Sequence, residues 1–347
     1  MNFAIGYQQP ENGQPFPEIV ADYRERIEEV YFPWVGAASG RAALGTGVGG
    51  GGRDWQAQAI LERDLAELRR QGIKLDLLFN ANCYGAAALS EALGNEIGSI
   101  IDHIGGVCGL PDVVTTTSLT IAHVVKTHFP GIETRASVNM RIGTIQAMDY
   151  AGAWFDSYYL QRDLQRDPDY VGKMHDWCLA HDKKLCLLVN SGCLRFCPGQ
   201  IYHDNLVAHD AEIDTRRNIP GFNPHVCWNL YRDHDRLVEF LKATWIRPED
   251  LSRYEGLADL FKLATRQHTH PRMVIEAYVS GHYRGDLLNL MEPCFAPAMA
   301  PRYLENSAFP DDWAKRMARC DDDCDTCGYC NDVLKMVVKT YENIERE

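Results

Sequence analysis

The sequence lacks several features that would assign it to a familiar class of protein. No stretch approaches 18 consecutive apolar residues, so we expect no transmembrane span. Residues 1–19 contain neither the basic nor the apolar segment of a secretory signal, which leads us to expect a cytoplasmic protein. Basic residues are scarce, 35 against 48 acidic ones for a net charge of −13, and this balance argues against binding to nucleic acid or to an anionic membrane.

Three catalytic motifs are also missing. There is no HExxH helix, which supplies zinc ligands in metalloproteases, no GxSxG turn, which carries the nucleophile of serine hydrolases, and no P-loop. These absences direct attention to the 12 cysteines. In a reducing compartment disulfides do not persist, so clustered cysteines more often bind metals or carry out redox chemistry.

Short apolar segments alternate with segments of helical periodicity along most of the chain. We expect strands at residues 2–8, 28–36, 74–83, 112–117, 133–140, 157–161, 183–190 and 257–265, and a glycine-rich loop at 37–53. Asp54 and Asp167 stand where each would cap a helix N-terminus. Buried strands that alternate with helices indicate a parallel sheet, and eight such units favour a TIM-like (β/α)8 barrel, with an open doubly wound sheet as the alternative.

The domain organisation follows from this pattern. We expect a barrel over residues 1–290 with a cysteine-bearing insertion at 191–245, and a C-terminal cysteine-rich extension over 291–347. Active sites of such barrels form at the C-terminal ends of the strands. In this sequence those ends carry polar or sulfur-bearing residues, which are Asn80, Asn82, Cys83, Thr115, Thr116, Thr117, Asn139, Arg141, Asp163, Asn190, Cys193 and Arg266.

Two cysteines in the insertion have the spacing of metal ligands. Cys193 and Cys197 are separated by three residues, and Pro198 follows as in the CP pair of ferredoxin-type ligation. On one helical turn or in a tight loop both sulfurs would point to one side. An iron–sulfur cluster or a zinc ion takes four ligands, so two more must come from elsewhere. Cys227, in the same insertion, and Cys83, at an earlier strand end, are the candidates.

The C-terminal segment CDDDCDTCGYC predicts a second metal site. It places Cys320, Cys324, Cys327 and Cys330 within 11 residues. Four free thiols so close together would be prone to oxidation, so metal ligation is the better explanation of this spacing. We favour a second iron–sulfur cluster, with zinc as the alternative, because zinc sites usually consist of two separated CxxC knuckles.

Three histidines, His203, His209 and His225, lie near the first cysteine pair. The simplest interpretation is that they are surface or hydrogen-bonded loop residues, and the alternative is proton transfer, since imidazole titrates near neutral pH. We take His203, together with Arg141 and Arg266 at strand ends, as candidate catalytic residues that bind a carboxylate or relay a proton.

Several segments resemble the peptidase U32 family, also called collagenase-like peptidases. NSGCLRFCPGQIYHDNLVAH resembles its NxGCxxxCP motif with the histidines that follow, and IRPEDLSRYEGLADLFKLATR and EAYVSGHYRGDLLNLM resemble its last-strand and following-helix motifs. FNANCYG resembles an early strand end of the family, and CDTCGYC the cysteine tail of some members. The match covers residues 70–335.

The resemblance implies a TIM-barrel-like fold and a four-cysteine 4Fe–4S cluster. Cys193 and Cys197 match cluster ligands directly, Cys83 and Cys227 would complete the set, and Cys294 is the alternative to Cys227. Related proteins support oxygen-independent hydroxylations, in ubiquinone biosynthesis and on RNA bases, with prephenate as hydroxyl donor in several cases.

Three hypotheses about function follow. The first is an iron–sulfur redox enzyme that hydroxylates or rearranges a small organic substrate, with a prephenate-like oxygen donor and electrons from the second cluster or another electron donor. The second is a non-catalytic, cluster-bearing partner of a homologous subunit. The third is a peptidase, as the family name implies, which the missing catalytic motifs disfavour. The acidic charge favours a small substrate over RNA.

Overall fold

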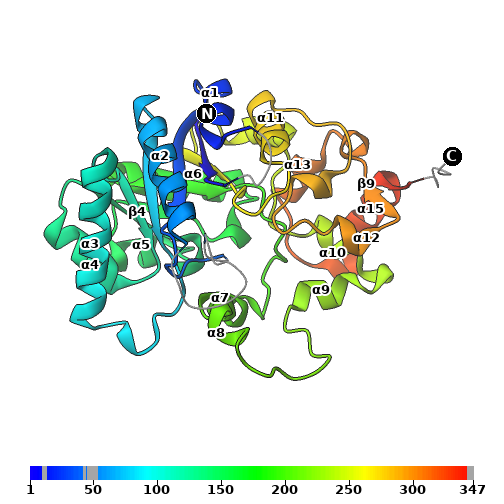
Figure 1. Cartoon of the computed structure of the whole chain (residues 1–347). Helices are drawn as coiled ribbons and strands as arrows, with labels where there is room; N and C mark the ends of the chain where they lie inside the picture. Colours follow the sequence, from blue (N-terminus) through cyan, green and yellow to red (C-terminus); the bar gives the residue numbers. More distant parts are fainter. Residues whose placement is uncertain (10–13, 42–43, 45–53, 342–347) are drawn as a thin grey trace.

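The structure is a computed structural model that describes residues 1–9, 14–41, 44 and 54–341; most of the predicted loop 37–53 lies outside the described residues. Eight parallel strands close into a barrel in sequence order, which confirms the (β/α)8 prediction over the open sheet (Figure 1). They are β1 (Phe3–Gly6), β2 (Ile27–Pro33), β3 (Lys74–Phe79), β4 (Val113–Thr116), β5 (Glu133–Ala136), β6 (Ser157–Tyr159), β7 (Lys184–Leu188) and β8 (Leu260–Leu263).

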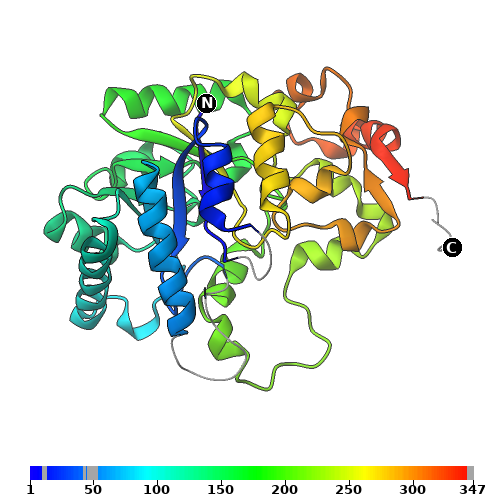
Figure 2. The same ribbon diagram turned by 45° about the horizontal axis from the view of Figure 1, so that its top comes forward.

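Helices connect consecutive strands and cover the outside of the barrel (Figures 1 and 2). They are α1 (Phe16–Asp22), α2 (Trp55–Arg70), α3 (Glu91–Cys108), α4 (Leu119–His128), α5 (Ile145–Ala151), α6 (Pro168–Ala180) and, after β8, α11 (Pro271–Ser280). The predicted caps are confirmed, since the carboxylates of Asp54 and Asp167 each accept hydrogen bonds from two backbone N–H groups of the first helical turn. No helix in the described part of the chain is both long and apolar enough to cross a membrane.

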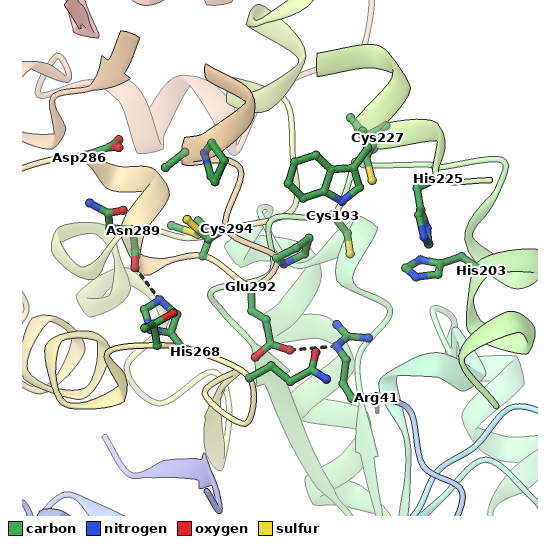
Figure 3. A pocket seen from close by; sticks show the side chains of 18 of the residues that line it. Arg41, Cys193, His203, His225, Cys227, His268, Asp286, Asn289, Glu292 and Cys294 are labelled. Carbon is green, nitrogen blue, oxygen red and sulfur yellow. Dashed lines mark hydrogen bonds and ion pairs between the residues drawn. The ribbon is translucent and has the colours of Figure 1, made fainter. Parts of the chain in front are cut away.

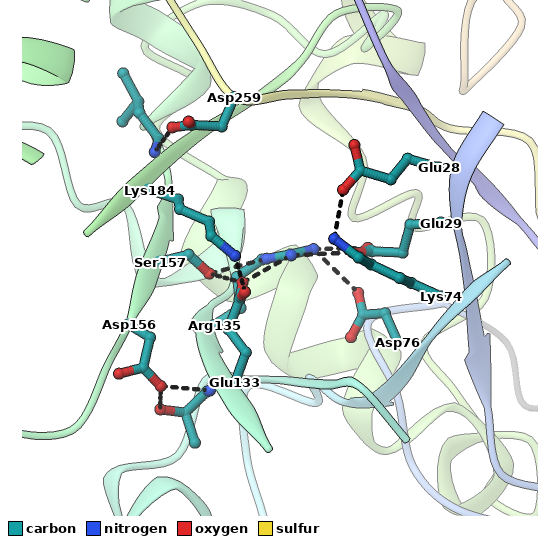
Figure 4. Close-up of polar contacts among 12 residues, drawn as sticks. Glu28, Glu29, Lys74, Asp76, Glu133, Arg135, Asp156, Ser157, Lys184 and Asp259 are labelled. Carbon is teal, nitrogen blue, oxygen red and sulfur yellow. Dashed lines mark hydrogen bonds and ion pairs between the residues drawn. The ribbon is translucent and has the colours of Figure 1, made fainter. Parts of the chain in front are cut away.

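The barrel interior is divided into an apolar and a charged region. The apolar region consists of Ala4, Tyr31, Leu78, Val138, Tyr159, Cys186, Leu188, Leu260 and Ala264. The charged region lies nearer the N-terminal ends of the strands, where Arg135 donates to both carboxylate oxygens of Glu29 at 2.6 and 3.0 Å and to Glu133 at 2.9 Å (Figure 4). Asp76 lies 3.7 Å from the same guanidinium. Because these groups are buried, they hold one another in place through paired charges rather than through apolar packing.

Between β7 and β8 the chain forms the cysteine-bearing insertion, with α7 (Gln200–Ala208), α8 (Asp210–Ile213), α9 (Val226–Tyr231) and α10 (Val238–Leu241). After α11 follow α12 (Ala296–Met299), β9 (Arg302–Leu304), α13 (Trp313–Met317), α14 (Cys324–Cys327), α15 (Tyr329–Val337) and β10 (Val338–Thr340), which pairs with β9. This C-terminal extension lies beside the insertion on one side of the barrel (Figure 1).

Aromatic packing joins the insertion to the extension. The indole rings of Trp245 and Trp313 stack at 5.9 Å, and the buried guanidinium of Arg166 lies over both rings at 4.9 and 5.3 Å. Arg166 also donates to the carbonyl oxygens of Leu241 and Ala243. Because these contacts link residues from three distant parts of the sequence, the extension is part of the same packed core as the barrel.

Candidate functional site

A cavity of about 790 Å³ opens where the chain leaves β7 and β8, at the C-terminal ends of the strands (Figure 3). Four thiols line it, those of Cys193, Cys197, Cys227 and Cys294, and we call it the thiol cavity. Cys193 and Cys197 lie in the loop between β7 and α7, and Cys227 lies in α9. The structure therefore brings three of the four predicted barrel ligands to one cavity, together with the predicted alternative, Cys294.

The loop that carries the first cysteine pair is shaped by close backbone contacts. A side chain at Gly192 would place its Cβ 2.7 Å from the carbonyl oxygen of Pro293, so only glycine fits there. Phe196 has a positive φ of 53°, and its backbone N–H donates to the buried carboxylate of Asp163 at 2.5 Å. These contacts hold the two cysteines of the loop in position against the extension.

The buried arginine Arg162 supports the thiol of Cys193. Its guanidinium donates to the Cys193 sulfur at 3.2 Å and to the side-chain oxygen of Asn139 at 3.1 Å. This contact fixes the position of the Cys193 sulfur at the wall of the thiol cavity. Asn139 and Arg162 follow β5 and β6, so the barrel itself positions this group.

The thiol cavity offers sulfur donors, the ligand type that iron–sulfur clusters and zinc take. Burial, with the neighbouring thiols of Cys193 and Cys197, raises the pKa of Cys227 to about 12, so in the absence of a metal the neutral thiol is favoured there. Across the described residues, however, no three His, Cys, Asp or Glu side chains are grouped closely enough to hold one metal ion. In a 4Fe–4S cluster each thiolate binds a different iron, which requires wider spacing than a single ion does. The thiols of this cavity are compatible with such a cluster.

Cys83, the remaining predicted ligand, does not line the thiol cavity. Its thiol instead hydrogen bonds with the imidazole of His209, and this contact lowers the pKa of Cys83. His209 in turn lies 3.7 Å from a carboxylate oxygen of Glu212. The three side chains form a thiol–imidazole–carboxylate series that spacing along the chain does not predict.

A second, smaller pocket of about 50 Å³ lies at the barrel mouth and shares Arg41 and Glu292 with the thiol cavity. Its charged lining consists of Arg41, Arg162, Lys262, Arg266 and Glu292, and we call it the cationic pocket. Arg41 donates to Glu292 at 2.9 Å and Arg266 to the hydroxyl of Ser39 at 3.2 Å. With four basic side chains against one carboxylate, the pocket favours an anion.

Burial increases this preference for an anion. It lowers the pKa of the Arg266 guanidinium to about 10 and lowers that of the Lys262 ammonium below its usual value. An anion bound beside these two groups would favour their charged forms. The Arg266 side chain reaches the pocket across Gly6 of β1, where an added Cβ would lie 2.6 Å from the Arg266 Cγ.

The other two predicted catalytic residues have different surroundings. His203, in α7, lines the thiol cavity, and its ring lies 4.6 Å from that of His225. Arg141 lines neither cavity; it pairs with Asp163 at 3.3 Å and hydrogen bonds with Gln200, at the start of α7. Arg141 thus holds α7 against the barrel, whereas His203 and Arg266 face enclosed space.

Several residues of the site were not predicted. Arg41 lies beside the glycine-rich stretch, and Glu292 lies in a proline-rich segment. Lys262 lies inside β8, and the lysine within the FKLAT segment was the only sign of it in the sequence. His268, which also lines the thiol cavity, makes a 2.7 Å contact with the carbonyl oxygen of Asn289. Such residues are found only when loops distant in the sequence are placed together.

Comparisons with known proteins give one clear sequence relative. The uncharacterized protease MJ1657 of Methanocaldococcus jannaschii is 26% identical over 291 residues, which cover 80% of this chain and 81% of that protein. No family model matches the chain.

Solved structures show distant likeness of fold. The U32 peptidase Mk0906 superposes with a TM-score of 0.49 at 13% identity, over 77% of this chain and 94% of that one. A glycoside hydrolase family 5 mannosidase from Rhizomucor miehei superposes with a TM-score of 0.41 at 9% identity, over 75% and 80%. Neither superposition carries an argument about activity. The chain is therefore similar in sequence to a protein of M. jannaschii that is named a protease, and it shares a barrel fold with the solved structures.

Proposed function

We propose that this protein is an iron–sulfur enzyme that acts on a small anionic organic substrate, in an oxygen-independent hydroxylation or a related rearrangement. The observation that supports it is the junction of the thiol cavity with the cationic pocket, through the shared residues Arg41 and Glu292. Cys193, Cys197 and Cys227 would hold a 4Fe–4S cluster, with Cys294 or, after a movement of its loop, Cys83 as a fourth ligand. Such a cluster supplies electron transfer and, where an iron lacks a protein ligand, a site for an oxygen-bearing group.

The chain's own residues would bind and orient the substrate. In the cationic pocket, Arg266 and Arg41 present planar guanidinium groups, which suit a carboxylate because they donate two parallel hydrogen bonds. Arg162 reaches both the pocket and the Cys193 sulfur, so a substrate anion held there lies next to the proposed cluster. A prephenate-like oxygen donor carries carboxylates of this kind, and His203, on the other side of the thiol cavity, would move a proton.

Anaerobic purification with iron, sulfide and zinc analysis tests the proposed cluster. We expect about four iron and four sulfide per barrel site in the intact protein, and their loss in the Cys193→Ala variant, because this sulfur cannot be replaced within the buried loop. Cys178→Ala, in a buried helix position away from both cavities, is the matched control and should keep its iron. About one zinc and no iron would refute the redox function.

A non-catalytic partner subunit is distinguished by turnover rather than by metal content. If the chain works only with a homologue, the purified protein would contain the cluster but would not convert an anionic substrate, and activity would appear on addition of the partner.

A peptidase is the second candidate, because one specific contact favours it. The thiol of Cys83 hydrogen bonds with His209, whose ring faces Glu212, and this is the order of groups in a cysteine nucleophile, its base and an orienting carboxylate. The sequence relative is named an uncharacterized protease. As a peptidase, the protein would attack a peptide carbonyl with the Cys83 sulfur and pass the thiol proton to His209.

Proteolysis of a fluorescent casein by the wild type and by Cys83→Ala decides between the two candidates. A peptidase of this kind would lose at least about 100-fold in rate in Cys83→Ala and in His209→Ala, and would keep its rate in Cys193→Ala. Cys108→Ala is the control for a thiol at the end of a helix. Equal rates in wild type and Cys83→Ala, or no proteolysis at all, would exclude this mechanism.

A further inference from the structure

The C-terminal cysteines, which the proposed function does not use, lie together on the surface of the extension. All four line one small hollow with Lys242 of the insertion; they are Cys320, Cys324, Cys327 and Cys330. Two residues of this segment have a left-handed backbone, Asp322 with φ 63° and Gly328 with φ 66°, and glycine adopts it at no steric cost. The segment thus places four thiols, within 11 residues of sequence, around one hollow.

One side of the hollow is closed by the protein and the other is open. Cys320 and Cys330 are half-buried against the core, whereas Cys324 and Cys327 are exposed in α14. One cation lies beside the thiols, since Lys242 lines the same hollow. A metal cluster held by four thiolates carries net negative charge, which this ammonium would partly offset.

An ion pair ties this hollow to the first cysteine loop. The guanidinium of Arg195, which lies between Cys193 and Cys197 in the sequence, contacts the carboxylate of Asp322 at 2.6 Å. Asp322 itself lies between Cys320 and Cys324, and its carboxylate accepts from the Cys320 thiol at 3.6 Å. The backbone oxygen of Asp163 accepts from the same guanidinium at 2.7 Å and fixes its direction. The two cysteine loops are therefore in direct contact.

We propose that the four C-terminal cysteines hold a second iron–sulfur cluster, docked on the first cysteine loop through Arg195 and Asp322. A cluster suits this segment better than zinc, because its four cysteines lie within 11 residues, whereas zinc sites usually consist of two separated CxxC pairs. Its role rests on the proposed function. A one-electron donor protein would be oxidised at the exposed face, by Cys324 and Cys327, and one electron would pass through this cluster to the first.

The test uses the full-length protein purified without oxygen, and the variant Cys324→Ser/Cys327→Ser. These two side chains are exposed, so their replacement should leave the fold intact, which circular dichroism checks. We expect about eight iron per chain in the wild type, about four in the variant, and about eight in the control Cys108→Ser. If the barrel site binds no iron, the wild type would contain about four and the variant almost none, so the two proposals fail separately.

Docking is tested by electron paramagnetic resonance of the fully reduced protein. Two reduced clusters in neighbouring loops broaden each other's signals, and the tail variant should show one unbroadened signal. Asp322→Asn should keep both clusters, because it removes no sulfur. It should alter the magnetic interaction between the two clusters, because it weakens the contact with Arg195. The proposal is overturned if the tail variant keeps all the wild-type iron, or if it loses one zinc per chain instead of iron.

Discussion

Replacing Arg135 by methionine is expected to lower the free energy of unfolding by about 3–5 kcal/mol, because it leaves buried carboxylates without their cation. The side chain of Arg135 is only 3% exposed, and Glu29 and Asp76 beside it are 2% and 0% exposed (Figure 4). Methionine fills a similar volume but donates no hydrogen bond. Urea denaturation of the wild type and the variant measures the difference.

The matched control for Arg135 is Lys184→Met. The Lys184 ammonium pairs with the same acid, Glu133, at 2.5 Å, but its side chain is 50% exposed, so we expect a loss below about 1 kcal/mol.

The Arg135 variant should also recover part of its stability as the pH falls. Burial and Glu29 already raise the pKa of Asp76, and without Arg135 its folded-state pKa is higher still, so protonation at low pH stabilises the folded variant. Equal losses in both variants would contradict this account.

Replacing Arg266 by leucine is expected to weaken the binding of small anions about 30-fold or more. Truncating one partner of a buried charge pair costs about 2–5 kcal/mol, and 1.4 kcal/mol corresponds to a factor of ten. Arg266 lines the cationic pocket with Arg41 and Lys262, so its guanidinium is placed to pair with an anion bound there. Thermal unfolding of the protein in titrations of acetate, succinate and inorganic phosphate gives the dissociation constants.

The control for this prediction is Arg272→Leu. Arg272 pairs with Asp22 at 2.6 Å on the outside of the barrel, is 41% exposed, and lines neither cavity. Its replacement should leave anion binding unchanged. If every anion stabilises the wild type and both variants to the same extent, the cationic pocket does not bind anions of this kind.

The barrel and its helices were predictable because their signals are local. Seven of the eight predicted strands contain an observed one, and β2 begins one residue before its predicted start. Asp54 and Asp167 cap the helices that follow them. The strands are shorter than predicted: the third ends at Phe79, so Asn80, Asn82 and Cys83 belong to the loop beyond it. The apolar pattern predicts which residues are buried, but it does not predict the residue at which a strand stops hydrogen bonding to its neighbour.

Local patterns predict the barrel, the resemblance to U32 peptidases and the two groups of closely spaced cysteines, because each depends on residues near one another in the chain. It takes the fold to show that Cys227 and Cys294 share a cavity with the first pair, that Cys83 lies beside His209 instead, and that Arg195 joins the two cysteine loops. The cationic pocket also appears only in the fold, since its residues come from the ends of β2, β3, β5, β6, β7 and β8 and from the segment after α11. These residues meet because the barrel closes and the extension packs against it, and spacing along the chain predicts neither event.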